Sequence, residues 1–292
     1  MLKRLFRPSR GPVLIAPRTY DTQHPDYDAR LARNEPGRII NAEAGRHPIL
    51  AEIAAMGNGT RVPAARWQPT LAAMRVELDA DPDAARLFEE RRALERHLDA
   101  LGRTFGAQYV AGWVNVEDGL VLYWLARRLR PRTIVQTGVC NGFSSAMLAL
   151  ALARNGDGGE LHAIDLPQVF DPRDAAWTRP GAVYGVMIPE GKASGWLVPA
   201  SCRERVHVQH GDAAVLLPPL LARLGTIDFF FHDSDHSYDH MAFEFREARR
   251  VLRPGGLVVA DDIAWNASLW DAADQWRVPA YNYAGSMGIA FL

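Results

Sequence analysis

The sequence predicts an α/β fold: a doubly wound, mostly parallel seven-stranded sheet with a C-terminal antiparallel hairpin and an N-terminal helical extension. Three observations support this prediction. Residues 133–150, TIVQTGVCNGFSSAMLAL, have the pattern of a strand, a glycine turn and a helix. Apolar strand-like runs then alternate with helical patterns, which is typical of a parallel sheet. Two short apolar runs about Gly285 and Ser286 at the end of the chain predict a hairpin.

The composition is that of an ordinary globular protein. Of the 292 residues, 48% are hydrophobic and 23% are charged, and the formal net charge is −1. A charge near zero is evidence against a nucleic-acid-binding surface or a basic membrane surface. The two cysteines make no disulfide framework, and no apolar stretch approaches the ~20 residues of a membrane-spanning helix. We therefore expect a cytoplasmic, soluble protein without nucleic-acid or membrane partners.

Residues 1–105 are expected to form an arm and a helical extension outside the main domain. The first 45 or so residues show no period and are interpreted as an irregular lead-in. Helices are predicted over residues 47–56, 65–78 and 84 to about 101. The last of these is amphipathic, so it packs either on the main domain or on a second subunit. The extension is thus a candidate cap or a candidate homo-oligomer interface.

Residues 106–292 are expected to form the main domain. A helix begins near Asn115 and ends at Pro131, and further helices are predicted over 144–154, 213–224 and 238–252. Five parallel strands are predicted over 133–136, 160–164, 206–210, 227–231 and 256–260. About forty residues rich in Pro, Gly and Trp interrupt this alternation after Asp165. Because long loops in compact domains usually bind or cover ligands, we expect an ordered lid at about 168–200.

Ligands of a doubly wound sheet bind beyond the carboxyl ends of its strands. Polar residues follow all five predicted strands at that point: Gly138, Asn141, Gly142 and Ser144, then Asp165, then Gly211 and Asp212, then Asp233, Ser234, Asp235 and His236, and finally Asp261 and Asp262. The glycines of the first turn permit a close approach of the backbone to a ligand. Their G-x-x-x-G spacing is neither the dinucleotide G-x-G-x-x-G nor the phosphate-binding G-x-x-x-x-G-K-[ST].

Two aspartates at these strand ends are suited to binding a nucleoside. Asp165 follows the second strand, where a carboxylate accepts hydrogen bonds from ribose hydroxyls, although it can also cap the turn before Pro167. Asp212 can cap the next helix, accept from an adenine amino group, or do both.

Three further aspartates predict a metal site. Asp233, Asp261 and Asp262 lie at the tips of adjacent strands, and converging carboxylates repel one another unless a cation or protons intervene. Oxygen ligands suit Mg²⁺. The alternative is that Asp233 or Asp235 binds cofactor while Asp261 and Asp262 cap the following turn. His236, three residues after Asp233, is suited to accept a proton near neutral pH.

Two other histidines flank this stretch. His232 is interpreted as a structural hydrogen-bond donor, and His240 as a surface residue of the following helix. No second His or Cys group with ligand spacing supports a zinc site made from these histidines.

These motifs resemble those of class I S-adenosylmethionine-dependent methyltransferases. VQTGVCNGFSSAML is similar to their first motif, HAIDLP to their second-strand acidic motif and HGDA to their adenine-side motif. IDFFFHDSDHSYDH followed by RPGGLVVADDIAWN resembles the metal-dependent O-methyltransferases of the catechol and caffeoyl-coenzyme A types. The similarity is closer still to bacterial enzymes that act on macrolide sugars and related natural products. The resemblance covers residues 115–292 and implies a Rossmann-like methyltransferase fold.

The resemblance also implies site residues. Those for S-adenosyl-L-methionine are Gly138, Asn141, Gly142 and Ser144 around the methionine part, Asp165 at the ribose, and Gly211 and Asp212 at the adenine. Asp233 would be a catalytic residue that contacts the cofactor and, with Asp261 and Asp262, holds Mg²⁺, while His236 would be the general base. Gln136 stands where the family usually has a glutamate bonded to the cofactor amino group, and its carbonyl can still accept that bond.

The implied activity is Mg²⁺-assisted transfer of a methyl group to a hydroxyl of a small acceptor, such as a sugar or natural product. Two alternatives are an NAD-linked oxidoreductase, which the absent G-x-G-x-x-G disfavours, and a non-catalytic cofactor-binding scaffold that assembles through its N-terminal helices.

Overall fold

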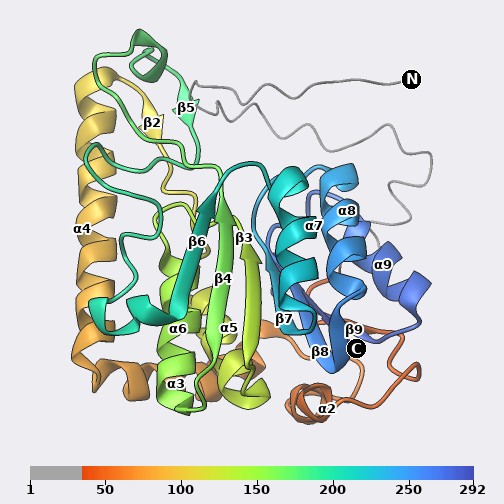
Figure 1. Cartoon of the computed structure of the whole chain (residues 1–292). Coiled ribbons are helices and arrows are strands. Elements are labelled where there is room, and N and C mark those ends of the chain that lie inside the picture. Colours follow the sequence, from red (N-terminus) through yellow and green to blue (C-terminus); the bar gives the residue numbers. More distant parts are fainter. Residues whose placement is uncertain (1–34) are drawn as a thin grey trace, which may run out of the picture.

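The computed structural model describes residues 35–292, and its strands form one large sheet in the order β1-β9-β10-β8-β7-β3-β4-β6 (Figure 1). Five strands are parallel to one another: β3 (Thr133–Thr137), β4 (Glu160–Asp165), β6 (Val206–His210), β7 (Ile227–His232) and β8 (Leu252–Ala260). β9 (Ala280–Tyr283) and β10 (Met287–Phe291) form the antiparallel hairpin beside β8. The predicted fold class and its seven strands are confirmed.

An eighth strand joins the sheet from the N-terminal segment. β1 (Ile39–Ile40) pairs antiparallel with β9 at the edge of the sheet. The prediction of an irregular lead-in is wrong at these residues, since two residues are too few to show a period. The rest of the predicted arm, residues 1–34, lies outside the described residues.

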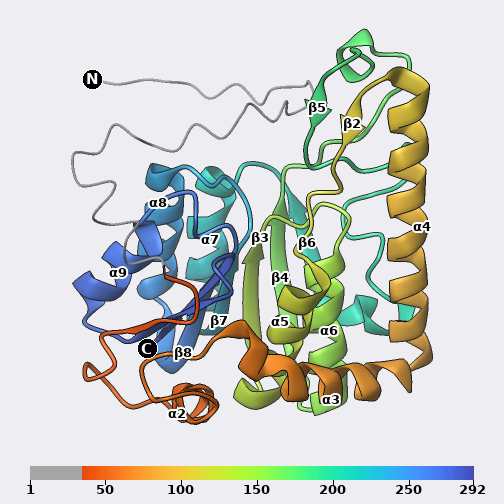
Figure 2. The same ribbon diagram turned by 180° about the vertical axis from the view of Figure 1, so that it is seen from behind.

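Helices cover both faces of the sheet (Figures 1 and 2). α5 (Val116–Leu129) and α6 (Phe143–Asn155) pack on one face, and α7 (Ala213–Leu224), α8 (Tyr238–Arg249) and α9 (Ser268–Trp276) pack on the other. The short α9 was not predicted. The predicted helix over 238–252 ends earlier, because β8 already begins at Leu252 and pairs with Ile227 before a bulge.

The N-terminal helices pack against the main domain of the same chain. They are α2 (Pro48–Ala55), α3 (Gln68–Asp79) and α4 (Pro82–Phe105), with short 3-10 turns at Ala64–Trp67, Ala175–Trp177 and Ala200–Arg205 elsewhere. α3 contacts α5 and α4 contacts α6. Leu87, Leu94 and Leu98 on the apolar face of α4 are buried, so this face is used within the chain. None of the helices in residues 35–292 has the length and apolarity to span a membrane.

The segment between β4 and β6 is folded. Its strand β5 (Val183–Tyr184) pairs in parallel with β2 (Gln108–Tyr109), which follows α4. The rings of Tyr109, Phe170, Trp177 and Tyr184 pack with centroids 5.2–5.8 Å apart. β2 and β5, which carry two of these rings, lie beyond the carboxyl ends of β3 and β4, at the top of Figure 1.

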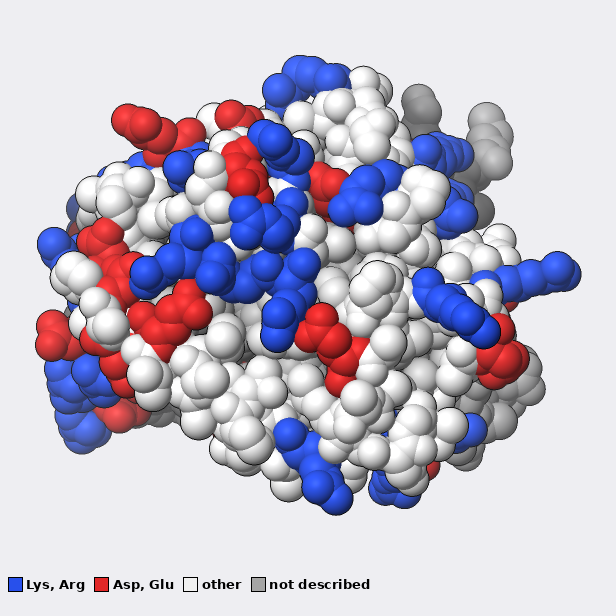
Figure 3. All heavy atoms as spheres, turned by 90° about the horizontal axis from the view of Figure 1, so that it is seen from below, with Lys and Arg blue, Asp and Glu red and all other residues white. Residues whose placement is uncertain are grey.

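The opposite end of the molecule, seen from below in Figure 3, carries a band of basic side chains among acidic ones. Arg127 and Arg154 form ion pairs with Glu77, and Arg130 with Asp157. Such solvent-exposed pairs each contribute about 0–1 kcal/mol, so packing of the sheet and helices dominates the stability here.

Candidate functional site

Asp165, the last residue of β4, anchors the glycine turn that follows β3. Its Oδ1 accepts hydrogen bonds from the backbone N–H of Val139 at 2.9 Å and of Cys140 at 3.1 Å. Its Oδ2 is buried and has no hydrogen-bond partner among residues 35–292. A buried carboxylate oxygen without a donor is costly. The site therefore fits a ligand that brings a hydroxyl donor to Asp165, as a ribose does.

Two glycines of the turn are required by contacts with protein backbone. Gly138 has φ +80°, and a Cβ there would lie 1.7 Å from the carbonyl oxygen of Asp233. Gly142 has φ +90°, and its Cβ would lie 2.6 Å from the Cα of Gly195. Side chains are excluded at both positions by other loops of the protein, in addition to any ligand.

Gln136 lies beneath the turn, stabilises it by hydrogen bonds and is wholly buried. Its Nε2 donates to the carbonyl of Gly138 at 2.6 Å and to Ser144 Oγ at 2.9 Å. Its Oε1 accepts from Ser145 Oγ at 2.9 Å. Both ends of the amide are thus paired inside the protein. The structure places Gln136 and Ser144 in this network, and their contacts with cofactor stay predictions.

Asn141 ties the turn to the 168–200 insertion. Its Nδ2 donates to the carbonyls of Ala111 and Met187, both at 2.9 Å, and its Oδ1 accepts from Trp196 Nε1 at 2.8 Å. The side chain is wholly buried. Asn141 therefore positions the insertion over the turn.

Gly211 and Asp212 lie beside Asp165 at the end of β6. The N–H of Gly211 donates to the Asp165 carbonyl at 2.8 Å. Asp212 Oδ1 accepts from the N–H of Ala214 at 2.8 Å, so Asp212 caps α7. The helix cap is one of the two roles expected for this residue, and it leaves the second carboxylate oxygen for another donor.

The predicted acidic group comes together with His236 at the ends of β7 and β8. His236 Nε2 lies 3.9 Å from Asp233 Oδ1 and 3.6 Å from Asp262 Oδ2. Burial raises the pKa of Asp233 and of Asp261 well above the usual range, and the neighbouring carboxylates raise it further. This concentration of like charge suits a cation.

The donor chemistry of this group fits Mg²⁺, which prefers carboxylate oxygens. The ligand atoms of this group are farther apart than those of residues that enclose a metal ion. Among residues 35–292, three potential metal ligands do lie this close together, with all their ligand atoms within 4.8 Å of one another. They are Glu160, His162 and His207, at the other end of the sheet.

Asp118 extends the acidic group and was missed in the sequence analysis, which interpreted residues 115–119 only as a helix start. It lies in the first turn of α5, is 2% exposed, and accepts from Asn115 Nδ2 at 2.6 Å and Ser286 Oγ at 3.1 Å. Burial, together with the charges of Glu117 and Asp262, raises its pKa to about 7 against these hydrogen bonds. Ser286 comes from the turn of the distant C-terminal hairpin, so no local pattern signals the contact.

The protonation of Asp118 predicts a pH dependence of stability. Its pKa is about 7 in the folded chain, against 3.8 for an unperturbed aspartate in the unfolded chain, so folding favours the neutral acid. The resulting stabilisation is complete below about pH 4 and is lost as the pH rises to about 7, on the order of 4 kcal/mol. Asp118→Asn, which cannot ionise, should lose this slope in urea unfolding measured from pH 4 to 8. Asp99→Asn on exposed α4 is the control, and parallel curves for wild type and Asp118→Asn would contradict the assignment.

Glu244 lies beneath the acidic group and links the residues around it by hydrogen bonds. This role was not predicted from the sequence. This wholly buried residue of α8 accepts from Thr137 Oγ1 and His232 Nδ1 at 2.6 Å each, from Ser234 Oγ at 2.8 Å and from His240 Nε2 at 2.9 Å. Burial alone would raise the pKa of Glu244, but the charge and hydrogen bonds of His232 and His240 hold it well below its usual range. The expectation of a structural role for His232 is confirmed. The expectation of a surface role for His240 is wrong, because its ring reaches back to Glu244.

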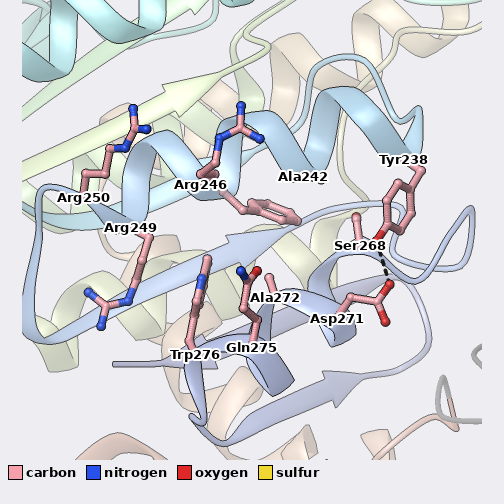
Figure 4. Close-up of a pocket in the computed structure, with 11 residues that line it drawn as sticks. Tyr238, Ala242, Arg246, Arg249, Arg250, Ser268, Asp271, Ala272, Gln275 and Trp276 are labelled. Carbon is pink, nitrogen blue, oxygen red and sulfur yellow. Dashed lines mark hydrogen bonds between the residues drawn. The ribbon is translucent and has the colours of Figure 1, made fainter.

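A separate groove of about 240 Å³ lies between α8 and α9 (Figure 4). Its lining includes Arg246, Arg249 and Trp276, and the Tyr238 hydroxyl donates to Asp271 Oδ2 at 2.7 Å at one end. None of the predicted site residues lines this groove.

The part of the chain that contains these motifs is similar to known proteins. Residues 135–263 match a family model described as a methyltransferase domain. A catechol O-methyltransferase from Niastella koreensis is 27% identical over 159 residues, which are 54% of this chain and 61% of that protein. The chain thus spans less than two thirds of the length of this relative.

Solved O-methyltransferase structures are more distant. One from Bacillus cereus in complex with SAH has a TM-score of 0.45 at 18% identity, and the match covers 68% of this chain and 90% of that chain. One from Streptomyces achromogenes, involved in tomaymycin synthesis and in complex with SAM, has a TM-score of 0.43 at 22% identity. This match covers 62% of this chain and 81% of that chain. The match to a methyltransferase domain over residues 135–263 includes the motifs that resemble those of S-adenosylmethionine-dependent methyltransferases.

Proposed function

We propose that the chain transfers a methyl group from S-adenosyl-L-methionine to a hydroxyl of a small molecule, such as a sugar or another natural product. The observation that supports this best is the pairing of two features at one edge of the sheet. Asp165 presents a buried oxygen that lacks a donor, and the acidic group with His236 lies at the neighbouring strand ends. The first suits a nucleoside hydroxyl and the second an acceptor oxygen.

On the donor side, Asp165 Oδ2 would accept from the ribose, and the glycine turn would hold the methionine part. When bound, S-adenosyl-L-methionine supplies a methyl group made electrophilic by its sulfonium. The first N–H groups of α6 lack partners within the helix and would be available to the methionine part of the cofactor. Leu166, which follows Asp165 and is 46% exposed, offers an apolar surface for the adenine.

On the acceptor side, Asp233, Asp261 and Asp262 would hold Mg²⁺. When bound, the ion supplies a positive charge that lowers the pKa of a ligated hydroxyl. Burial, and secondarily the charge of His232, lowers the pKa of His236 to about 3, so the imidazole is neutral at neutral pH. Its Nε2 faces the acidic group and would take the proton from the acceptor. The 168–200 insertion would exclude water and contact the acceptor.

A screen of hydroxylated metabolites with labelled cofactor and mass-spectrometric detection identifies the acceptor. With it, His236→Ala should lower kcat by roughly 10²- to 10⁴-fold, the usual contribution of a general base, and leave cofactor affinity unchanged. His97→Ala, an exposed histidine of α4, is the matched control. Chelation should abolish transfer, and added Mg²⁺ should restore it.

Each part of the proposal can fail separately. Absence of S-adenosyl-L-methionine binding in calorimetry would contradict the whole, and binding of a nicotinamide cofactor in its place would favour the oxidoreductase. Transfer that survives chelation would remove the metal alone. A His236→Ala enzyme with wild-type kcat would assign the proton to another base.

A further inference from the structure

We propose that Glu160, His162 and His207 form a binding site for a late first-row divalent cation such as Zn²⁺, at the end of the sheet opposite the acidic group. Glu160 and His162 lie at the start of β4, and His207 lies on β6 in register with His162. The Nε2 atoms of both histidines lie 3.4 Å from the same oxygen, Oε2 of Glu160. All three ligand atoms lie within 4.8 Å of one another.

These distances match a metal site better than a hydrogen-bonded cluster. A hydrogen bond between a charged imidazole and a carboxylate is about 2.7–2.9 Å long. Two ligand atoms that are each about 2.0–2.1 Å from a tetrahedral Zn²⁺ are, by geometry, about 3.4 Å apart. Two imidazoles and one carboxylate also form a ligand set that zinc uses in proteins.

His162 supplies a second, independent indication. Its side chain is 9% exposed, and Nε2 is the ring nitrogen that faces Glu160. The nearest carboxylate is the Glu160 contact at 3.4 Å, so the ring is buried without a hydrogen bond of ordinary length.

The site is preorganised and open. The rings of His162 and His207 stack with centroids 4.8 Å apart and an interplanar angle of 23°. The side chains of Glu160 and His207 are 51% and 45% exposed, which provides an entry path and room for a water as fourth ligand.

The ion would cross-link two strands that serve the cofactor site. β6 is the edge strand of the described sheet and pairs there with β4. At their carboxyl ends these strands lead to Asp165 and to Gly211, whereas the ion would join their amino ends. A cation bound at this site would therefore stabilise the edge strand without touching the acidic group or the reacting atoms.

Calorimetric titration of the chelator-treated full chain with ZnCl₂ tests the site. We expect Zn²⁺ binding with a stoichiometry of one at this site, and at least about 10-fold weaker binding in His207→Ala and Glu160→Gln. His210→Ala removes an exposed histidine from the far end of the same strand and should bind as wild type does. Asp233→Asn should also retain the site, which separates it from the acidic group.

Amide hydrogen exchange provides a readout that does not depend on activity. Zn²⁺ should slow exchange of the β6 amides in wild type and in His210→Ala but not in His207→Ala. Wild-type affinity and stoichiometry in His207→Ala, or no Zn²⁺ binding by the wild type, would overturn the proposal. Binding that leaves β6 exchange unchanged would overturn the strand cross-link.

Discussion

Replacing Glu244 by alanine is expected to destabilise the fold by about 3–5 kcal/mol, the usual cost of removing one partner from a buried ionic network. The carboxylate is wholly buried and accepts four hydrogen bonds from Thr137, His232, Ser234 and His240. Alanine would leave these donors buried without an acceptor, and each such group carries a desolvation cost. Because Thr137 ends β3 and His232 ends β7, the loss would also loosen the two strands that meet at the site.

Urea unfolding at neutral pH measures this effect. Glu52→Ala on α2 is the matched control, because Glu52 pairs with Arg128 at the surface and its loss should cost no more than about 1 kcal/mol. Equal losses in the two variants would show that the Glu244 network contributes no more than a surface ion pair.

Replacing Asp165 by asparagine is expected to weaken binding of S-adenosyl-L-methionine by roughly 10- to 100-fold, the range expected when a hydrogen bond to a charged group is lost. Asparagine keeps one oxygen for the N–H groups of Val139 and Cys140. It replaces the unpaired Oδ2 with an amide N–H₂ group, which donates hydrogen bonds. A ribose hydroxyl that donates to the carboxylate would therefore lose its acceptor.

Calorimetry with S-adenosyl-L-methionine gives the affinity, and thermal unfolding shows whether the variant keeps the fold. Asp171→Asn is the control: this exposed aspartate of the insertion pairs with Arg173, and its loss should leave the affinity unchanged. If Asp165→Asn folds and binds the cofactor as tightly as wild type, the ribose is not held by Asp165.

Elements with a clear local pattern could be predicted from the sequence. α7 begins at Ala213 and ends at Leu224 as predicted, because Asp212 caps it and Gly225 follows it. The central parallel strands β3, β7 and β8 were recognised by their apolar runs, since strands buried on both faces need apolar side chains. Two-residue strands could not be found in this way: β1, β2 and β5 exist through partners more than forty residues away.

The same division applies to the site. The sequence alone determined that Asp165, Asp233 and His236 lie at one edge, because carboxyl ends of parallel strands meet there. Only the tertiary structure decided that Asp118 joins the acidic group and that Glu244 lies beneath it. The physical reason is the separation of hydrogen-bond partners along the chain: Glu244 and Thr137 are 107 residues apart, and Asp118 and Ser286 are 168 apart. The existence and position of the longer strands and helices follow from local patterns, whereas a buried polar side chain takes its partner from whichever loop the fold brings to it.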